Sequence, residues 1–238
     1  MGSTLSVKLR EGTEKAHTMT ENVGFVKCFL KGVVEKSSYR KLVCSLYYVY
    51  SEMETQMRSH REHPVVGKLY YPVQERQTSL EEDMSIYYGS DWQQQISRSP
   101  ATKAYIQRIQ EIAATAPELL IAHSYTRYLG DLSGGQILQG IVQRSLNLPA
   151  KKGSAFYLFD DIADEKQFKA DYRQRLDALP IDEATAEKIV DEANAAFELN
   201  MKVFQELEGS LLKSIGQMLF NSLTRRRPLR QATLVPTD

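Results

Sequence analysis

Apolar residues recur at intervals of three and four along most of the chain, which is the spacing of one face of an α-helix. The clearest case runs from Tyr39 to Met57, where the apolar side chains keep to one broad stripe. Valine and isoleucine nowhere alternate with polar residues for long enough to indicate a strand, and no Asn-Gly or Asp-Gly pair indicates a hairpin. The pattern predicts an all-α protein.

Cap and stop residues divide this pattern into helices. We expect helices over residues 4–18, 22–32, 38–60, 79–88, 100–114, 117–147, 165–178 and 183–222. Polar residues that favour helix starts precede several of them: Ser37 or Ser38, Ser79 with Glu82 as a capping box, Ser99 before Pro100, Asp164 and Asp182.

The stretch 63–78 interrupts the helical pattern with two prolines and a glycine. We interpret it as a loop rather than as a domain boundary, because neither side has a composition of its own. The prediction is one domain over residues 1–222. Residues 223–238 form a tail that loses periodicity from Arg225 on, and we expect this tail to be disordered.

The amino-acid composition excludes several classes of protein and of binding partner. With 42% hydrophobic and 25% charged residues, the 238-residue chain is ordinary for a globular protein, which excludes disordered, collagen-like and coiled-coil classes. Thirty basic and thirty acidic side chains balance, so no net field favours nucleic acid or an anionic membrane. No apolar run is long enough to span a bilayer and no signal peptide is visible, so the sequence predicts a soluble, cytoplasmic protein.

The two cysteines, Cys28 and Cys44, stand apart from each other and from any histidine cluster. This spacing argues against a zinc site and against a disulfide scaffold. Both are expected to be packing residues in a reducing compartment.

Glycines concentrate where the pattern is otherwise helical. Four of them fall within eleven residues: Gly130, Gly134, Gly135 and Gly140. Each glycine in a helix interior costs about 1 kcal/mol relative to alanine, so something requires bare backbone there. One explanation is a close crossing of two helices, and the other is a flat ligand against the helix with Asp131 beside it. A bend is expected at Ser133–Gly135.

Two histidines draw attention. His17 lies on the apolar stripe of the first predicted helix, and Arg10 lies two turns earlier on the same side, where it could reach an anion that touches the histidine. A lone helical histidine is more often structural than a metal ligand. His123 shares a face with Leu119 and Leu120 and is expected to be a hydrogen-bonded interior residue.

Polar neighbours surround the remaining histidines, His60 and His63, and we expect both to be solvated. Lys169 and Arg173 are a pair of like charge one helical turn apart. They either form a solvated ladder with Glu165 and Asp177 or hold a carboxylate ligand.

Two runs carry a family resemblance: ELLIAHSYTRYLGDLSGGQ from Glu118 to Gln136, and KAHTMTENVGF from Lys15 to Phe25. They closely resemble heme oxygenases, particularly the soluble type of cyanobacteria and algal plastids. The likeness covers about residues 5–222 and continues through DEANAAFELN from Asp191 to Asn200. An algal source would place the protein in the plastid stroma.

The resemblance implies one helical domain that holds heme b between a proximal helix and a kinked distal helix. His17 matches the axial iron ligand and Asp131 the catalytic aspartate. Gly130 and Gly134 match the glycines whose backbone approaches the porphyrin. Other positions match residues that hold the propionates (Arg10, Tyr125, Lys169 and Arg173) or that belong to the distal hydrogen-bond network (Tyr50 and Arg127).

The implied reaction uses heme as both cofactor and substrate and converts it with O2 to biliverdin IXα, carbon monoxide and Fe2+. No flavin or dinucleotide fingerprint occurs in the chain. The implied electron donor is ferredoxin, docking on a basic rim that includes Lys15, Lys169, Arg173 and Arg175, and a bilin reductase would act downstream. A noncatalytic heme carrier and a helical interaction protein without cofactor remain the alternatives.

Overall fold

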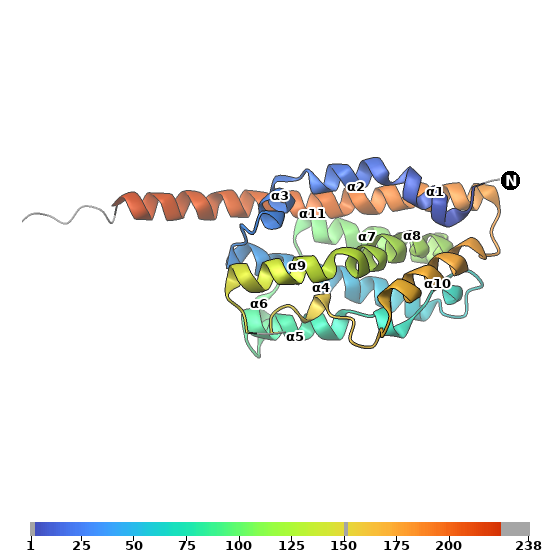
Figure 1. The fold of residues 1–238 in the computed structure, drawn as a ribbon, viewed down its shortest axis with the longest axis horizontal. Coiled ribbons are helices and arrows are strands. Elements are labelled where there is room, and N and C mark those ends of the chain that lie inside the picture. The colour runs from blue at the N-terminus through green and yellow to red at the C-terminus, as the bar shows by residue number, and fades with distance from the viewer. Residues whose placement is uncertain (1–2, 150–151, 225–238) are drawn as a thin grey trace, which may run out of the picture.

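The structure is a computed structural model that describes residues 3–149 and 152–224, with side chains described through residue 208. Its elements are all helices, which confirms the predicted fold class (Figure 1). In chain order they are α1 (Leu5–Gly12), α2 (Glu14–Glu21), α3 (Gly24–Leu30), α4 (Lys36–Ser59), η1 (Val66–Lys68), η2 (Pro72–Gln74), α5 (Gln77–Tyr88), α6 (Trp92–Gln95), α7 (Pro100–Thr115), η3 (Pro117–Leu119), α8 (Leu120–Ser124), η4 (Tyr125–Leu129), α9 (Gly130–Leu146), η5 (Ala155–Tyr157), α10 (Glu165–Asp177) and α11 (Glu183–Thr224).

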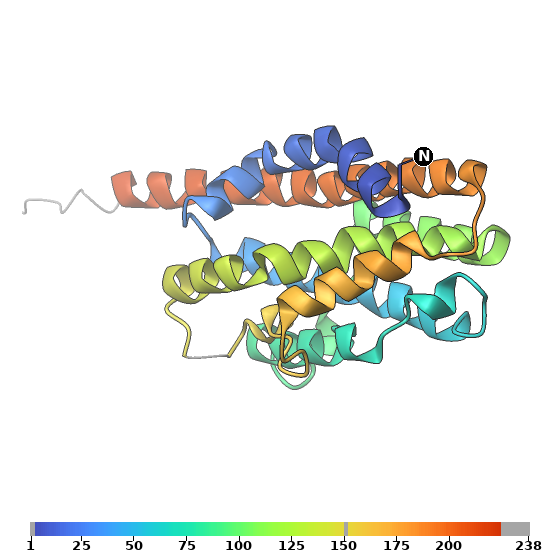
Figure 2. The ribbon, with the colours of Figure 1, turned by 45° about the vertical axis from the view of Figure 1, so that its right-hand side comes forward.

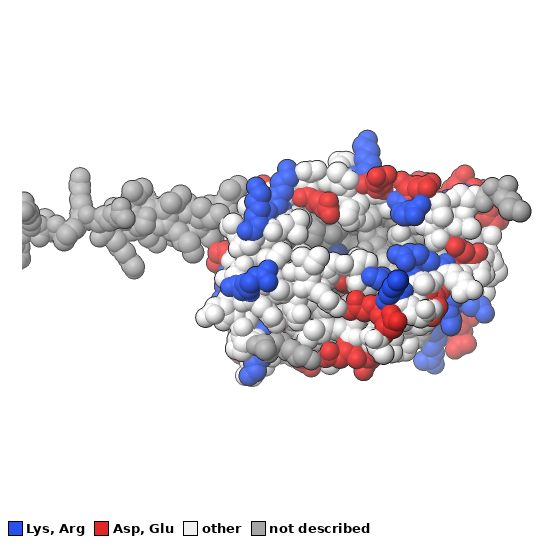
Figure 3. Space-filling view, viewed as in Figure 1, with Lys and Arg blue, Asp and Glu red and all other residues white. Residues whose placement is uncertain are grey.

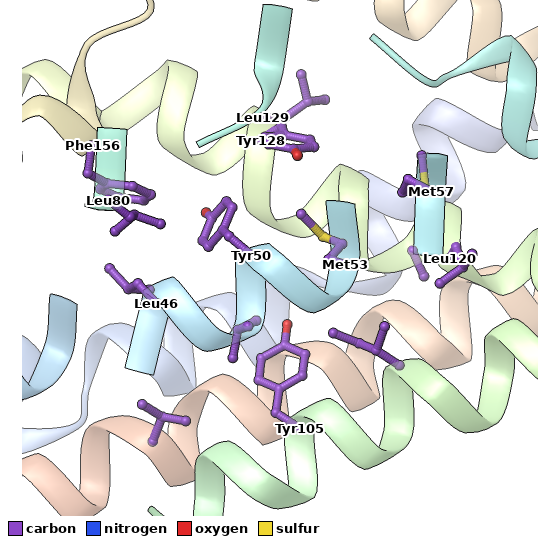
Figure 4. Close-up of a cluster of buried hydrophobic side chains, with 14 of the residues drawn as sticks. Leu46, Tyr50, Met53, Met57, Leu80, Tyr105, Leu120, Tyr128, Leu129 and Phe156 are labelled. Atoms are coloured by element: carbon purple, nitrogen blue, oxygen red, sulfur yellow. The ribbon is translucent and has the colours of Figure 1, made fainter. Parts of the chain in front are cut away.

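Helix α4 forms the centre of the fold and packs against α5, α7, α8 and α11. Its apolar stripe meets side chains of the neighbouring helices in one continuous core (Figure 4). Tyr50, Met53 and Tyr105 are among the largest fully buried side chains of this core. The long helix α11 runs along α1, α2 and α3 on one side and α4, α7 and α8 on the other, so it joins two layers (Figures 1 and 2).

Several helix starts agree with the sequence prediction. The Ser99 hydroxyl accepts a hydrogen bond from the Thr102 amide at 3.2 Å, and Pro100 follows it as the first helical residue. Asp164 caps α10 by accepting from the Gln167 amide at 2.9 Å. These caps depend only on residues three positions away, which is why the local pattern revealed them.

Two other predicted caps are wrong. The cap of α4 is Glu35 rather than Ser37 or Ser38, because its carboxylate accepts from the backbone amides of both serines at 2.9 and 2.8 Å. Helix α5 begins at Gln77, earlier than the predicted capping box at Ser79. Its start is stabilised by Glu54 of α4, which accepts from the amides of Arg76 and Gln77 at 2.6 and 3.1 Å.

The first predicted helix is in fact two helices. The backbone leaves helical geometry at Thr13, with φ −106° and ψ −1°, so that α1 ends at Gly12 and α2 begins at Glu14. The Thr13 hydroxyl donates to the carbonyl of Leu9 at 2.7 Å, and such bonds back to the preceding turn bend helices. Arg10 and His17 therefore stand on different helices.

The predicted helix over 117–147 is divided as well. A π-helical turn, η4, separates α8 from α9. The departure from regular helix thus lies at Tyr125–Leu129, ahead of the expected bend at Ser133–Gly135, while Gly130–Leu146 is continuous α-helix. A π-turn inserts one residue into the helical register and changes which side chains share a face.

The loop interpretation of 63–78 agrees with the structure. Up to Arg76 the stretch holds only the short turns η1 and η2, and its last two residues already belong to α5. Val66 and Leu69 within it are fully buried in the common core. Cys44 is buried, Cys28 is half-buried, and both are free thiols. Within the described ranges no helix is both long and apolar enough to cross a bilayer. Of the predicted tail over 223–238, the first two residues belong to α11, and the rest lies outside the described residues.

Candidate functional site

A cavity of about 890 Å³ opens between α2 and α9, with walls from α1, α10 and α11. Figure 3 shows the molecular surface hollowed at this place, with basic side chains at one end of the hollow. Most of the predicted site residues line it: Arg10, His17, Tyr125, Arg127, Gly130, Asp131 and Arg173. Of the other predicted residues, Tyr50, Gly134 and Lys169 lie beside the lining. Residues as far apart in the sequence as Arg10 and Arg173 thus come together at one place.

The α2 wall presents His17. Its side chain is 58% exposed and lines the cavity, while its Nδ1 lies 3.8 Å from the Glu21 carboxylate one turn later. The ring of Phe197 on α11 contacts the imidazole edge-on, with centroids 5.7 Å apart. One ring nitrogen therefore has a carboxylate near it, an arrangement that orients histidines for metal binding.

The α9 wall has bare backbone at the predicted positions. A Cβ built on Gly130 or on Gly134 would meet no described atom within 4 Å. Helix crossing therefore does not explain these two glycines, because a crossing helix would place atoms there. Gly135 differs, since its Cβ would touch Tyr157 at 3.6 Å. The open space at Gly130 belongs to the cavity, where a flat ligand could approach the helix closely.

At this wall, the half-buried Asp131 belongs to a hydrogen-bond network that continues into the core. The Tyr50 hydroxyl donates to Oδ2 of Asp131, and Nε of Arg127 donates to the Tyr50 oxygen at 3.0 Å. Nη1 of Arg127 donates in turn to the side-chain carbonyl of Asn200 on α11 at 2.7 Å. The network joins α4, η4, α9 and α11, so the position of the carboxylate depends on the whole core.

Burial controls the protonation of this network. Burial raises the pKa of Asp131 even though the Arg127 charge and the Tyr50 hydrogen bond act in the opposite direction. Burial also raises the pKa of Tyr50 well above its usual range, so the phenol keeps its proton and remains a donor. Asp131 is thereby held in place by a neutral donor, with its second oxygen left for a solvent or ligand contact.

The end of the cavity near α10 is basic. Burial raises the pKa of Tyr125, and the charges of Arg173 and Arg10 act against that rise, which places both guanidinium groups near the phenol. Lys169 bonds the Leu132 carbonyl of α9 at 3.1 Å, next to the lining. Together these groups could bind an anion such as a carboxylate.

The solvated charge ladder is absent among the described side chains. Glu165 accepts instead from Gln136 at 3.2 Å, and Asp177 accepts from the backbone amide of Ser6 at 2.8 Å. Lys169 and Arg173 bond only backbone carbonyls within that part of the chain. Their positive charges therefore remain available to a ligand.

The other histidines take structural positions. His123 is fully buried and its Nε2 lies 3.0 Å from Glu192, which confirms the predicted interior role. The solvated state expected of His60 and His63 is wrong, because both are half-buried and bond backbone groups. His60 Nδ1 bonds the Gln56 carbonyl at 2.8 Å.

Sequence reasoning missed Glu21, Phe197 and Asn200, which all line the cavity. Glu21 could have been found, since it follows His17 by four residues and so shares its helix face. Asn200 lies inside a run that carries the family resemblance, but its contact with Arg127 joins residues 73 positions apart. No local pattern indicates that pairing.

Comparisons with known proteins agree with this geometry. The family model described as heme oxygenase matches residues 3–206. Heme oxygenase 1 of Nostoc sp. is 65% identical over 237 residues, which cover 100% of this chain and 99% of that protein. The crystal structure of heme oxygenase-1 from Synechocystis sp. in complex with heme superposes with a TM-score of 0.90 at 62% identity, covering 93% of this chain and 100% of that one.

A second structure, heme oxygenase-2 from the same cyanobacterium in complex with heme and NO, has a TM-score of 0.88 at 48% identity and covers 95% of this chain and 94% of that one. Both the matched length and these identities are far above what shared architecture alone produces. From its sequence, its fold and the composition of its cavity, the chain belongs to the heme oxygenase family.

Proposed function

We propose that this enzyme binds heme b in the cavity between α2 and α9 and cleaves it with O2 at the α-meso carbon to biliverdin IXα, carbon monoxide and Fe2+, with electrons from reduced ferredoxin. The observation that carries the proposal is that His17 and Asp131 line the same cavity, where Gly130 has no side chain to fill the space between them. Heme, when bound, supplies an iron that binds O2 and a macrocycle that is oxidised.

The cavity suits a flat molecule with an apolar body and carboxylates on one edge. Its walls include Phe25, Phe29, Leu42, Leu138 and Phe204, all apolar. The basic end would receive the carboxylates. A porphyrin with two neighbouring propionates has this distribution of polarity.

His17 is the residue we assign to the iron. Its imidazole faces the cavity, and Glu21 would hold the ring by accepting from Nδ1–H, which leaves Nε2 for the metal. An uncharged nitrogen ligand donates less electron density than a thiolate, which suits chemistry that must preserve the O–O bond until oxygen reaches the ring.

Asp131 is assigned to proton delivery through water. Tyr50 occupies one carboxylate oxygen, and the other can orient a water molecule toward the ligand. Arg127 holds Tyr50 in place and is itself held by Asn200. These residues would order solvent at a distance from the reacting atoms, and Gly130 and Gly134 would let the macrocycle lie close to the α9 backbone.

Regiochemistry is assigned to the basic end. Arg10, Tyr125 and Arg173 would fix the propionates and so fix the rotation of the macrocycle in its plane, with Lys169 beside them. The meso carbon that meets the α9 wall follows from that rotation.

The electron donor is proposed from family resemblance, and surface charge supports it. Lys15, Arg173 and Arg175 are exposed and Lys169 is half-buried. Of these, Arg173 lines the cavity and Lys169 bonds the Leu132 carbonyl beside it. An acidic ferredoxin would dock there, with a rate that falls as salt is added. The proposed location is the cytoplasm or a plastid stroma, where a bilin reductase could take the product.

The test is aerobic incubation of the purified protein with hemin, reduced ferredoxin and its reductase. We expect a shift of the heme absorption band on mixing, and then a green pigment that chromatography identifies as biliverdin IXα, with carbon monoxide released in equal amount. Heme that binds but survives the reductant would support a noncatalytic carrier instead. An unshifted band would support an interaction protein without cofactor.

A further inference from the structure

The short turn η5 supplies part of the cavity wall but depends on other elements for its position. Phe156 and Tyr157 of η5 both line the cavity. The turn has only three residues, and so short a 3-10 turn is not stable in water by itself. The place of these two aromatic side chains is therefore set by the groups that bond η5 from outside.

Three of these bonds come from one face of α5. Asp83 is fully buried, and its Oδ1 and Oδ2 accept from the backbone amides of Ala155 and Phe156 at 2.8 and 2.9 Å. One helical turn later, the Tyr87 hydroxyl donates to the Gly153 carbonyl at 2.6 Å. Helix α5 thus binds the backbone on both sides of the point where η5 begins.

The charge of Asp83 makes it a strong anchor. Burial raises the pKa of Asp83 to about 6, although the two amides act against that rise. The group is therefore a carboxylate at neutral pH, and each of its oxygens can accept a charge-assisted hydrogen bond. From the other side, Gln143 of α9 adds a longer bond to the Ser154 hydroxyl at 3.2 Å, between neutral groups.

Phe156 connects η5 to the hydrogen-bond network of Asp131. Its ring meets the Tyr50 ring edge-on, with centroids 5.2 Å apart, and in Figure 4 it points toward Tyr50. The Tyr128 ring also contacts Tyr50, with centroids 5.9 Å apart. These rings fix the plane of Tyr50, whose hydroxyl donates to Asp131. A shift of Phe156 would change the direction of that hydroxyl.

We propose that Asp83 is a positioning residue for the reaction in the cavity: it holds η5 so that Phe156 keeps the Tyr50 hydroxyl directed at Asp131. The proposal rests on the proposed function, in which Asp131 delivers protons through water. Asp83 does not line the cavity itself, so its effect on the reaction passes through η5.

The first test is substitution of Asp83 in the full-length protein. Asp83→Asn keeps the shape of the side chain but can accept at one oxygen only. At pH 7.5 we expect hemin affinity to change by less than about threefold and single-turnover biliverdin formation to slow by about tenfold. Glu82→Gln is the matched control, because it removes the same charge from an exposed position next to Asp83 on α5. It should react like the parent protein.

Tyr87→Phe is a milder variant of the same anchor. It removes only the hydroxyl that bonds Gly153 and keeps the aromatic ring. We expect it to slow single turnover by about threefold, in the same direction as Asp83→Asn. If Asp83→Asn does not fold, as judged by circular dichroism, Tyr87→Phe takes its place in every measurement.

A double-mutant cycle separates positioning from simple stabilisation of the fold. Tyr50→Phe removes the hydroxyl through which Asp83 is proposed to act, and it should slow single turnover by itself. Adding Asp83→Asn to Tyr50→Phe should then slow the reaction by less than about a further twofold. An equal factor in both backgrounds would make Asp83 a structural residue only, and normal turnover in Tyr50→Phe would remove the proposed route; either result overturns the proposal.

Hydrogen exchange of the protein without hemin tests the anchor independently of the reaction. The amides of Ala155 and Phe156 should exchange about tenfold faster in Asp83→Asn than in the parent protein or in Glu82→Gln. Unchanged exchange would overturn the proposal. So would normal turnover in both Asp83→Asn and Tyr87→Phe, which would leave the proposed function intact. Absence of biliverdin from the parent protein would overturn both.

Discussion

Single side chains set the proton chemistry of the cavity. Burial makes the Asp131 carboxylate harder to ionise, while Arg127 and Tyr50 make it easier, and burial has the larger effect. The Tyr50 hydroxyl also occupies one oxygen and so fixes the direction of the other. A carboxyl group whose pKa is raised and whose second oxygen is not taken by Tyr50 is suited to pass a proton through water.

Asp131→Asn tests this role. An amide keeps the shape of the side chain but cannot exchange the proton, so we expect hemin affinity to change by less than about threefold and biliverdin formation to fall by about 100-fold or more. Hemin titration and single-turnover spectra provide the two measurements. Asp171→Asn, at an exposed position of α10, is the matched control and should react normally. A normal biliverdin yield from Asp131→Asn would remove the residue from the proton path.

Gly130→Ala and Gly135→Ala test whether a ligand approaches the backbone of α9 at Gly130. Gly135 is the comparison, because it packs against Tyr157 of the protein itself. Both changes favour helix by up to about 1 kcal/mol, and neither added Cβ meets a described atom closer than 3.6 Å. We expect both to raise the melting temperature slightly. Only Gly130→Ala should weaken hemin binding and slow turnover, because only Gly130 lines the cavity. Equal hemin affinity in the two variants would show that the ligand does not approach Gly130.

The sequence predicted these residues to different degrees. The glycine cluster beside Asp131 was visible without any comparison, because glycine is costly in a helix and needs a reason. The helical spacing brought His17 and Arg10 to notice, but only the family resemblance implied an iron ligand and a propionate contact, since a lone helical histidine is more often structural. The partnership of Arg127 with Asn200 could not be predicted, because it joins segments that meet only in the folded chain.

Among the elements, success followed both the distance to the group that satisfies a helix end and the type of that group, since the start of α4 is capped locally but by Glu35, which is not one of the usual cap residues. Starts capped from within three residues, at Ser99 and Asp164, were predicted correctly. The start of α5 was not, because Glu54 satisfies its amides from a distant helix. Burial raises the pKa of Glu54 to about 7, although both amides and Tyr128 act against that rise.

Helix α10 permits a test of regiochemistry. Lys169 and Arg173 lie on one face of it, beside the basic end of the cavity. Replacing both with alanine should weaken the proposed binding of the propionates, so we expect rotated heme and a mixture of biliverdin isomers. The total rate with ferredoxin should also fall, because the same two charges belong to its proposed docking surface. Chromatography of the product mixture measures this. The variant Lys166→Ala/Arg175→Ala removes the same charge from α10 outside the lining and should keep a single isomer. A pure α isomer from the first variant would assign selectivity to the α9 wall alone.

In the molecule as a whole, α11 packs against both layers of helices. Its buried charged residue Glu192 makes contacts that hold it to one of them. The carboxylate bonds Arg108 of α7 and His123 of α8. Burial acts to raise the pKa of Glu192, but hydrogen bonds from His123 and Arg108 outweigh it and lower the pKa to about 2.

Glu192→Gln should therefore destabilise the fold in a pH-dependent way. Because the pKa is lower in the folded than in the unfolded state, the carboxylate stabilises the fold fully above about pH 4.5 and loses this effect as the pH falls toward 2. We expect a loss of about 3 kcal/mol in the free energy of unfolding at pH 7, and less than half of that at pH 3. Urea titrations measure both.

Glu111→Gln is the control for that series. Glu111 also pairs with Arg108, at 3.0 Å, but its side chain is 59% exposed. Exposed pairs contribute less than about 1 kcal/mol, so this variant should be close to the parent protein at either pH. If the free energy of unfolding lost in Glu192→Gln did not change with pH, the packing of the side chain, and not its charge, would hold α11 in place.

The break at Thr13 has a consequence for local stability. Upstream of it, α1 is fastened by Ser6 to Asp177 and by Lys8 to Glu183, and Leu5 and Leu9 are buried. Downstream, Thr20 is the one buried side chain of α2. The break at Thr13 therefore separates the well-anchored helix α1 from the less well-anchored helix α2. Backbone amide protons of α2 should exchange with deuterium sooner than those of α1. Helix α2, which bears His17, would then become fully ordered only when the cavity ligand binds to it.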